Sequence, residues 1–286
     1  MVTILFDGIA YGMLLFVLAC GLTVTMGLMN FINLSHGAFA LAGGYATAAL
    51  TQKLGLPFLL CLPLAFLFSA VLGMVAEALL YRRLYHRSHL DQVLFTIGIV
   101  FMTVAAVDYI IGSQQQSIAL PAWLRGRIDI LGGSIGLYRL FIIILCGCLA
   151  LAIQWLLSHT RFGSQLRASV DDPRVARGLG IPVNRVFAVT FALGCGLAGL
   201  GGALGADLLG MDPTFPIKFM IYFLIVVTVG GTSGIMGTFF AALLLGIADV
   251  AGKYYVPQIG AFVIYALMVA VLILRPQGLF TRGGGR

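Results

Sequence analysis

Charged residues are scarce in this chain of 286 residues, in which Asp, Glu, Lys and Arg together make up 9%. Soluble domains carry about 25% charged residues, so a soluble globule of this size could not cover its surface with so few. Hydrophobic residues make up 60% and form long continuous runs, unlike the alternating segments of about ten residues in a membrane β-barrel. The composition therefore predicts an all-α polytopic membrane protein.

Motifs of nucleotide hydrolysis and of metal-dependent proteolysis are also missing. The sequence has no G-x-x-x-x-G-K-[ST] phosphate loop and no H-E-x-x-H pair. The five cysteines lie within apolar runs without zinc-site company, so we interpret them as small buried hydrophobic residues. We therefore expect no catalysis, no metal site and no cofactor in this chain, which leaves a transport or channel role.

Apolar runs of about 20 residues are long enough to cross a bilayer as helices. Counted with its shorter runs, the chain is predicted to form about eight or nine transmembrane segments, one or two of them short or broken. We expect residues 1–286 to form a single transmembrane domain. The candidate runs are 4–28, 36–52, 58–81, 93–111, 137–157, 186–209, 219–229 and 235–274, the last of which holds two.

Basic residues gather in alternate connections, and such gathering orients a membrane protein with its positive loops in the cytoplasm. Because the last group follows the final run, the carboxyl end is predicted to be cytoplasmic. Eight spans place the amino end inside and nine place it outside, and both remain open. The residues assigned to the cytoplasm are Arg82, Arg83, Arg87, Arg161, Arg167, Arg174, Arg177, Arg185, Arg275, Arg282 and Arg286.

Two polar or glycine-rich breaks interrupt the apolar pattern. Backbone released from helical hydrogen bonding at membrane depth must be buried in protein or line a wet cavity, and short broken segments can mark a transport pathway. We therefore predict that the breaks line the translocation pathway, with plain turns at the membrane surface as the alternative. The pathway residues are Asn30, Asn33, His36 and Gly37 in the first break and Gly230, Gly231 and Thr232 in the second.

Four acidic residues lie within or near the ends of apolar runs, namely Glu77, Asp108, Asp207 and Asp249. Charged side chains inside a membrane are costly and are functional candidates by default. Glu77 lies close to an arginine along the chain, and Asp249 precedes Lys253 by one helical turn. Local ion pairs are therefore the alternative for these acids.

Small residues recur at every fourth position in the run 186–209, at Gly194, Ala198 and Gly202. This spacing puts them on one helix face and allows close helix packing. We expect a packing surface there, either within the subunit or against a partner.

The longest polar stretch, residues 159–185, contains the signals of one short helix. Asp171 or Asp172 can cap its start, and the proline that follows them fits a first helical turn. Gly178 or Gly180 can end it. We therefore predict a short surface helix between two spans.

In such a helix Val175 and Leu179, which are four residues apart, lie on one face and form an apolar stripe with arginines around it. The stretch is then either a solvated, positively charged loop or a docking surface for a cytoplasmic protein. The residues that we expect to take part in docking are Asp171, Asp172, Arg174, Ala176, Gly178, Leu179 and Gly180.

Short sequence blocks are spread in order over nearly the whole chain: Gly21-Leu22-Thr23, Asn33 to Gly37, Thr96-Ile97-Gly98, Leu179-Gly180-Ile181, Gly230-Gly231 to Thr238, Gly246 to Asp249, and Arg275 to Leu279. In these blocks the chain resembles permease subunits of ABC importers of the branched-chain amino acid type. That family serves the uptake of hydrophobic amino acids, amides and urea. Ala38 stands where its members often have an acid, so the resemblance leaves the solute open between amino acids and neutral solutes.

The resemblance implies a permease subunit of an ATP-driven importer for small polar solutes, with branched-chain or other amino acids as the first candidates. The implied partners are a second homologous permease, two ATP-binding subunits and an external substrate-binding protein, all at a bacterial cytoplasmic (inner) membrane. We expect no nucleic-acid partner. The ATPases would bind ATP and magnesium, and the loop 159–185 would be the cytoplasmic coupling loop.

Two other classes of transporter remain open on the residues alone. An ion-coupled secondary transporter would use intramembrane acids and need no ATPase. A passive channel for a small neutral solute, such as urea or an amide, would need no docking loop. Acidic residues that are essential for uptake would indicate the ion-coupled transporter. Solute uptake without an energy source would indicate the passive channel.

Overall fold

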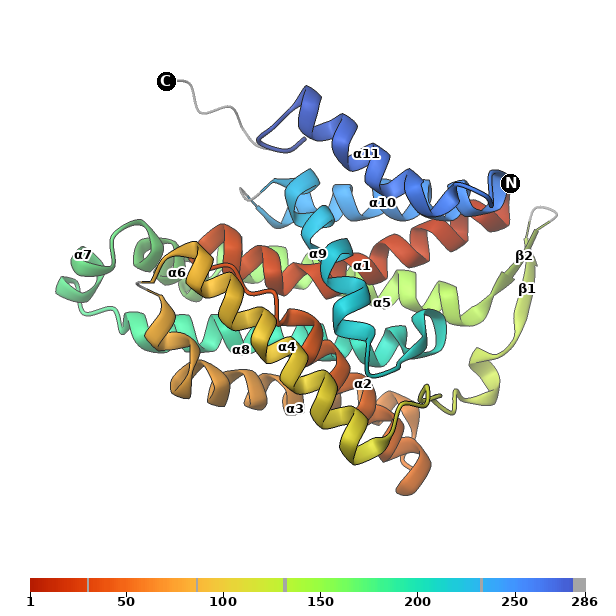
Figure 1. Ribbon diagram of the computed structural model, residues 1–286, viewed down its shortest axis with the longest axis horizontal. Coiled ribbons are helices and arrows are strands. Elements are labelled where there is room, and N and C mark those ends of the chain that lie inside the picture. Colours follow the sequence, from red (N-terminus) through yellow and green to blue (C-terminus); the bar gives the residue numbers. More distant parts are fainter. Residues whose placement is uncertain (30, 86, 131–132, 232–233, 280–286) are drawn as a thin grey trace.

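The structure, a computed structural model, describes residues 1–29, 31–85, 87–130, 133–231 and 234–279. Helices run back and forth between the two ends of the long axis, some of them obliquely (Figure 1). The larger helices are α1 (Val2–Met29), α2 (His36–Lys53), α3 (Phe58–Leu79), α4 (His89–Ile111), α5 (Leu137–His159), α8 (Val183–Gly205), α9 (Phe215–Gly230), α10 (Ile235–Tyr255) and α11 (Gly260–Leu274).

Shorter elements join them. The chain forms single helical turns at η1 (Tyr81–Leu84), η2 (Ala122–Leu124) and η3 (Ala206–Gly210), and short helices at α6 (Arg161–Asp171) and α7 (Pro173–Gly178). Strands β1 (Arg127–Ile130) and β2 (Gly133–Gly136) pair antiparallel, with Ile128 opposite Ile135. This hairpin lies in the connection between α4 and α5, and its strands were not predicted.

Six helices of the described chain are long and apolar enough to cross a membrane: α1, α3, α4, α5, α8 with η3, and α10. Helices α9 and α11 are shorter apolar helices, and α2 has 18 residues of lower apolarity. The polytopic helical class is therefore confirmed, while the number of eight or nine spans stays a prediction. The last stretch divides into α10 and α11 as expected, and α9 begins earlier than the apolar run because Pro216 fits its first turn.

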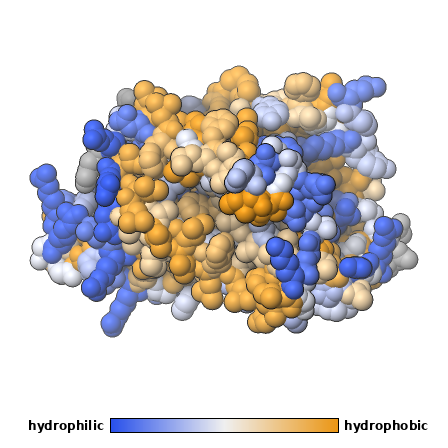
Figure 2. Space-filling model, turned by 60° about the horizontal axis from the view of Figure 1, so that its bottom comes forward, coloured by the Kyte–Doolittle hydropathy of each residue, from blue (hydrophilic) through white to orange (hydrophobic). Residues whose placement is uncertain are grey.

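The molecule has two distinct ends. One carries α6 and α7, and we call it the α7 end; the other carries the amino terminus and the strands, and we call it the hairpin end (Figure 1). Figure 2 shows a broad hydrophobic band between hydrophilic side chains gathered at both ends. This distribution is that of a protein whose middle lies in lipid.

Helix α8 occupies the centre of the bundle, where small residues let other helices approach its backbone. Gly194 lies against the backbone of Gly21 in α1, and a Cβ atom on Gly202 would overlap the carbonyl group of Ala40 in α2. Ala198, between them, is fully buried. The small-residue surface predicted on this helix therefore packs within the subunit.

Candidate functional site

The first polar break is buried. Helix α1 ends at Met29, and α2 begins at His36. The side chain of His36 lies beside Gly21 of α1 and Gly194, which is near the middle of α8. Asn33 has no exposed surface, and His36 is 1% exposed. Asn30 lies outside the described residues. The segment is therefore packed inside the bundle, as backbone without helical hydrogen bonds must be at membrane depth.

Side chains of α4 supply the hydrogen bonds that the broken backbone lacks. The amide N–H of Ile32 donates to Oε1 of Gln92 at 3.2 Å, and that of Leu34 donates to Oγ1 of Thr96 at 3.3 Å. Both acceptors are buried, so each bond satisfies a backbone donor that would otherwise have no partner. Helix α4 thus holds the shape of the break.

A second network fixes the end of the break. The hydroxyl of Ser35 donates to Oδ1 of Asn33 at 2.6 Å and lies 2.5 Å from the phenol oxygen of Tyr81. Tyr81 has no exposed surface, and its ring packs edge-on against Phe31 at the other end of the segment. The connection after α3 is therefore joined to both ends of the break.

Gln92 and Tyr81 are residues that sequence analysis missed, and Thr96 was noted only within a family block. A signal for Gln92 was present, because it precedes Thr96 by four residues at the edge of an apolar run and so shares its helix face. Tyr81 had no such signal, since a tyrosine at a helix end is common at membrane interfaces.

Gly37 lies where two helices start close together. A Cβ atom at this position would be 2.9 Å from the Cα atom of Pro216, in the first turn of α9. Only a residue without a side chain leaves room for this contact. The first break therefore meets the start of the helix that leads to the second.

The second break is a tight connection between α9 and α10. Gly231 ends α9 with φ of +81°, and a Cβ atom on Gly230 would be 2.7 Å from the Cα atom of Thr238. Thr232 lies outside the described residues. After α11 the chain returns to this place, where Leu279 donates its amide N–H to the carbonyl of Val229 at 2.9 Å. The glycines thus permit both a left-handed turn and close backbone contact.

The predicted short helix is present as α7. Asp172 caps it, because its Oδ1 accepts hydrogen bonds from the amides of Arg174 at 2.8 Å and Val175 at 3.0 Å. Gly180 follows its end with φ of +81°. Of the alternatives left open by the sequence, Asp172 and Gly180 are therefore the residues that begin and end the helix.

Helix α6, which precedes it, was not predicted. Thr160 caps α6 by accepting the amide N–H of Gly163, and Leu166 is fully buried against the bundle. A Cβ atom on Gly163 would overlap the backbone of Leu157 in α5. Helix α6 thus fixes the polar stretch to the transmembrane helices, and α7 projects from it.

Two apolar side chains are exposed in α7 and directly after it. Leu179 is 75% exposed and Val175 is 58% exposed, whereas Ala176 is only 2% exposed and faces the body. The other docking candidates, Asp171, Asp172, Arg174, Gly178 and Gly180, are all exposed. Val175 and Leu179 are therefore exposed together among charged side chains, as the predicted apolar stripe requires.

Two of the four acids form the local ion pairs that were the alternative for them. Glu77 has no exposed surface, and its carboxylate accepts hydrogen bonds from Arg82 at 3.1 Å and from the hydroxyl of Tyr85 at 3.1 Å. The hydrogen bond with Glu77 raises the pKa of Arg82 above its ordinary value. Asp249 pairs with Lys253 at 2.6 Å.

Asp212, in the connection before α9, is another acid held in its charged form. Burial alone would raise its pKa, but hydrogen bonds from Lys218 and Thr214 outweigh burial and lower the pKa below the ordinary value. The Lys218 contact is 2.5 Å long. This pair fixes the connection at the hairpin end.

Comparison with known proteins identifies the family. The profile described as "Branched-chain amino acid transport system / permease component" matches residues 4–272, which is nearly the whole chain. The chain belongs to this family. It is a transport permease of the membrane, and its resemblance to that family is confirmed.

Relatives of this permease are similar over nearly the whole of this chain. The LivH permease protein of the high-affinity branched-chain amino acid transport system of Escherichia coli is 26% identical over 97% of this chain and 94% of its own. The BraD permease protein of Pseudomonas aeruginosa is 27% identical over 97% and 95%. The LivM permease protein of Escherichia coli is 26% identical over 93% of this chain and 68% of its own. No solved structure is significantly similar.

Proposed function

We propose that this permease is the membrane-spanning subunit of an ATP-driven importer for branched-chain amino acids. The observation that carries the proposal is the family match over nearly the whole chain, with LivH and BraD similar from end to end. The chain itself has no phosphate-binding loop. The energy must then come from separate ATPases, which would bind ATP and magnesium.

A second permease is the first partner that we propose. In Escherichia coli two different proteins, LivH and LivM, bear the name of one branched-chain amino acid transport system, and this chain is similar to both. Helix α4 is also largely exposed, and its exposed apolar side chains include Phe101, Met102 and Ile110. A pathway between two related subunits fits both observations, and an external binding protein would deliver the solute.

Helix α7 is proposed as the coupling element on which an ATPase acts. Its exposed Val175 and Leu179 offer an apolar contact, and its anchor through Ala176 and α6 passes motion to the bundle. Coupling requires such a firm connection, because a flexible loop would absorb the movement of the ATPase. Residues 159–185 are then the coupling loop of a single permease domain, 1–286.

The two breaks are proposed as the moving parts of the translocation pathway. Asn33, His36 and Gly37 lie at the junction of α1, α2 and α9, and Gly230 and Gly231 at the junction of α9 and α10. Asn30 and Thr232 adjoin them in the sequence. Helices interrupted at these points can tilt separately on either side of each break, which opens and closes a path between subunits.

The α7 end is proposed to be cytoplasmic. The basic residues around η1, α6 and α7 lie at that end, and the positive-inside rule places such clusters in the cytoplasm. The chain end after α11 also reaches the second break, next to the start of α10. The carboxyl end is therefore expected in the cytoplasm, and the permease in a bacterial inner membrane.

The test is uptake and ATP hydrolysis by the complex with its ATPases, carrying Leu179→Asp in this chain. We expect branched-chain amino acid uptake to fall strongly while the chain remains folded in the membrane. The matched control is Leu54→Asp, which changes a leucine that is 67% exposed at the hairpin end. Equal uptake by the two variants would contradict the docking role of α7.

The same preparation separates the alternatives. An ion-coupled transporter would keep its uptake without ATPases and lose it when Asp108, Asp207 or Asp249 is neutralised. A passive channel for a neutral solute would equilibrate that solute without ATP or an ion gradient. Either result would contradict the proposal of an ATP-driven importer and support the corresponding alternative.

A further inference from the structure

The chain turns back onto the bundle where α11 ends. The amide N–H of Gly278 donates to the carbonyl of Arg275 at 3.0 Å, which closes a tight turn with Pro276 in its second position. Proline suits the second position of such a turn, and glycine suits the fourth. The turn brings residues 275–279, which we call the carboxyl-terminal strap, onto the end of α9.

The strap completes the last turn of α9. The final carbonyl groups of a helix have no hydrogen-bond partner within the helix. In α9 the carbonyl of Val227 accepts the amide N–H of Gly231 at 2.9 Å, and the carbonyl of Val229 accepts that of Leu279 at 2.9 Å. Val229 has no exposed surface, and the side chain of Leu279 is partly buried against the core. The strap therefore caps α9 from a distant part of the sequence.

Two glycines permit this contact. Gly231, at the second break, has φ of +81°, and Gly278 of the strap has φ of +91°. A Cβ atom on Gly278 would be 2.6 Å from both the Cα and the N atom of Gly231, and 3.1 Å from the carbonyl oxygen of Thr228. These neighbours are backbone atoms, which cannot turn aside as a flexible side chain can. A side chain at position 278 would therefore push the strap off α9.

The strap is attached to α11, and α11 packs chiefly against α10 rather than α9. A Cβ atom on Gly260, at the start of α11, would be 2.6 Å from the Cα atom of Lys253 in α10. From there α11 diverges from α10 toward the α7 end, where the strap reaches α9 (Figure 1). The second break lies between α9 and α10. Any tilt of α9 against α10 must therefore change its contact with the strap.

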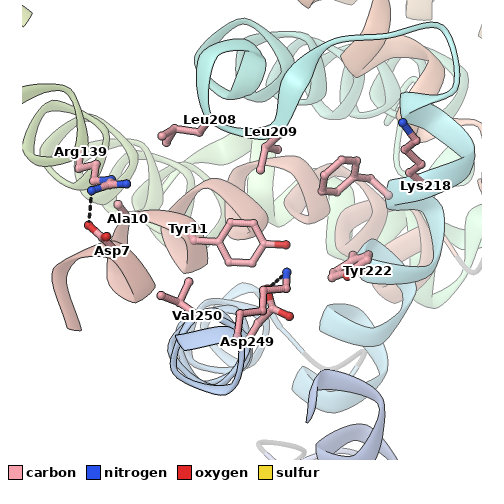
Figure 3. Close-up of a pocket in the computed structure, with 12 residues that line it drawn as sticks. Asp7, Ala10, Tyr11, Arg139, Leu208, Leu209, Lys218, Tyr222, Asp249 and Val250 are labelled. Carbon is pink, nitrogen blue, oxygen red and sulfur yellow. Dashed lines mark hydrogen bonds and ion pairs between the residues drawn. The ribbon is translucent and has the colours of Figure 1, made fainter. Parts of the chain in front are cut away.

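The first half of α9 has room for such a tilt. A cavity of about 640 Å³ lies beside it, and Tyr222 of α9 and Asp249 of α10 both line this cavity (Figure 3). A close-packed interior offers no such space for a helix to move. At its start α9 touches the first break, where Pro216 meets Gly37. The angle of α9 therefore depends strongly on the contacts at its two ends.

We propose that the carboxyl-terminal strap sets the angle of α9 at the second break and releases α9 during each transport cycle. Gly278 and Leu279 are then positioning residues, because they touch α9 and act on the translocation pathway through it. One hydrogen bond and one backbone contact are few enough for an ATP-driven cycle to break and remake. The proposal rests on the proposed function and deepens it, since it names the contact that controls one of the two breaks.

The first test places Gly278→Ala in the full complex, reconstituted in liposomes with its ATPases and external binding protein. The added methyl group should hold the strap off α9, so that ATP is hydrolysed without a complete transport step. The number of leucine molecules taken up per ATP hydrolysed should fall about 5- to 150-fold, the usual range of coupling between linked sites. A merely structural defect would lower uptake and hydrolysis alike and leave this ratio unchanged.

Gly112→Ala is the matched control. Gly112 follows α4 with φ of +97°, and a Cβ atom there would have no neighbour within 4 Å. This variant therefore strains the backbone as Gly278→Ala does, without a collision, and its ratio of uptake to hydrolysis should equal that of the wild type.

A second measurement needs no variant. Hydrogen exchange of the wild-type complex in nanodiscs, followed by mass spectrometry, reports the peptide that contains the amide of Leu279. Its protection in the resting complex should be lost in the complex trapped with ATP and vanadate. The amides in the centre of α8 should stay protected in both states.

Three outcomes would overturn the role of the strap. They are a wild-type ratio in Gly278→Ala, an equal fall of the ratio in Gly112→Ala, and equal protection of the Leu279 amide in the resting and trapped complexes. The exchange measurement decides alone if Gly278→Ala does not assemble. In each case ATP-dependent leucine uptake by the wild-type complex would still support the proposed function, whereas its absence would refute that function separately.

Discussion

Thr23 and Thr238, 215 positions apart in the sequence, join their hydroxyl groups at a distance of 2.9 Å. Thr23 lies in α1 shortly before the first break, and Thr238 lies in α10 shortly after the second. Both side chains are buried. The two breaks are therefore connected through one hydrogen bond between the helices that flank them.

This hydrogen bond predicts measurable coupling between the two threonines. Replacing each with valine keeps the shape and removes the hydroxyl, and a double-mutant cycle of Thr23→Val and Thr238→Val isolates their interaction. We expect a coupling of about 0.6 kcal/mol, the average for such bonds between membrane helices. Unfolding in mixed micelles with increasing SDS measures it, and strictly additive effects would contradict the contact.

The support of the first break by α4 predicts unequal effects of two similar substitutions. Thr96→Val leaves the amide of Leu34 without its acceptor and should destabilise the chain by about 1–3 kcal/mol. Thr103→Val is the control, because its hydroxyl bonds only to the carbonyl of Ile99 in its own helix. The same unfolding assay compares them, and equal losses would show that α4 does not hold the break.

The packing of α8 predicts opposite effects for two glycines. Gly202→Ala should destabilise the chain by about 1–3 kcal/mol or more, because its Cβ would overlap the backbone of Ala40. Gly147→Ala, in α5, places its Cβ in open space and should stabilise the helix by up to about 1 kcal/mol. Thermal unfolding in detergent tests the contrast. Two destabilised variants would mean that α5 packs against something at Gly147.

The cap of α7 predicts a local effect that distinguishes neighbouring acids. Asp172→Ala removes the acceptor for two amides and should cost α7 about 1 kcal/mol. Asp171→Ala should leave the helix unchanged. Hydrogen exchange of the amides in α7, followed by mass spectrometry, should be faster only in the first variant. If α7 couples the ATPase, uptake should fall in that variant too.

The sequence predicted much of the site without its geometry. Composition and run length gave the membrane class, because too few charges exist to cover a soluble protein. The glycines and polar residues of the two breaks were visible as interruptions of apolar runs. The start of α7 followed from an acid and a proline in adjacent positions, since capping is a local interaction.

Only the tertiary structure decided which side chains form hydrogen bonds with the broken backbone. Gln92 and Thr96 reach the broken backbone across 60 and 62 positions of sequence, and no local pattern reports such a contact. The approach of Asp249 to Tyr11 and Tyr222 likewise needs three helices to meet. Hydropathy and capping depend on neighbours in the chain, so the sequence by itself determined them. Pairing across helices depends on how the bundle packs, so the fold alone determined where the broken backbone finds its hydrogen-bond partners.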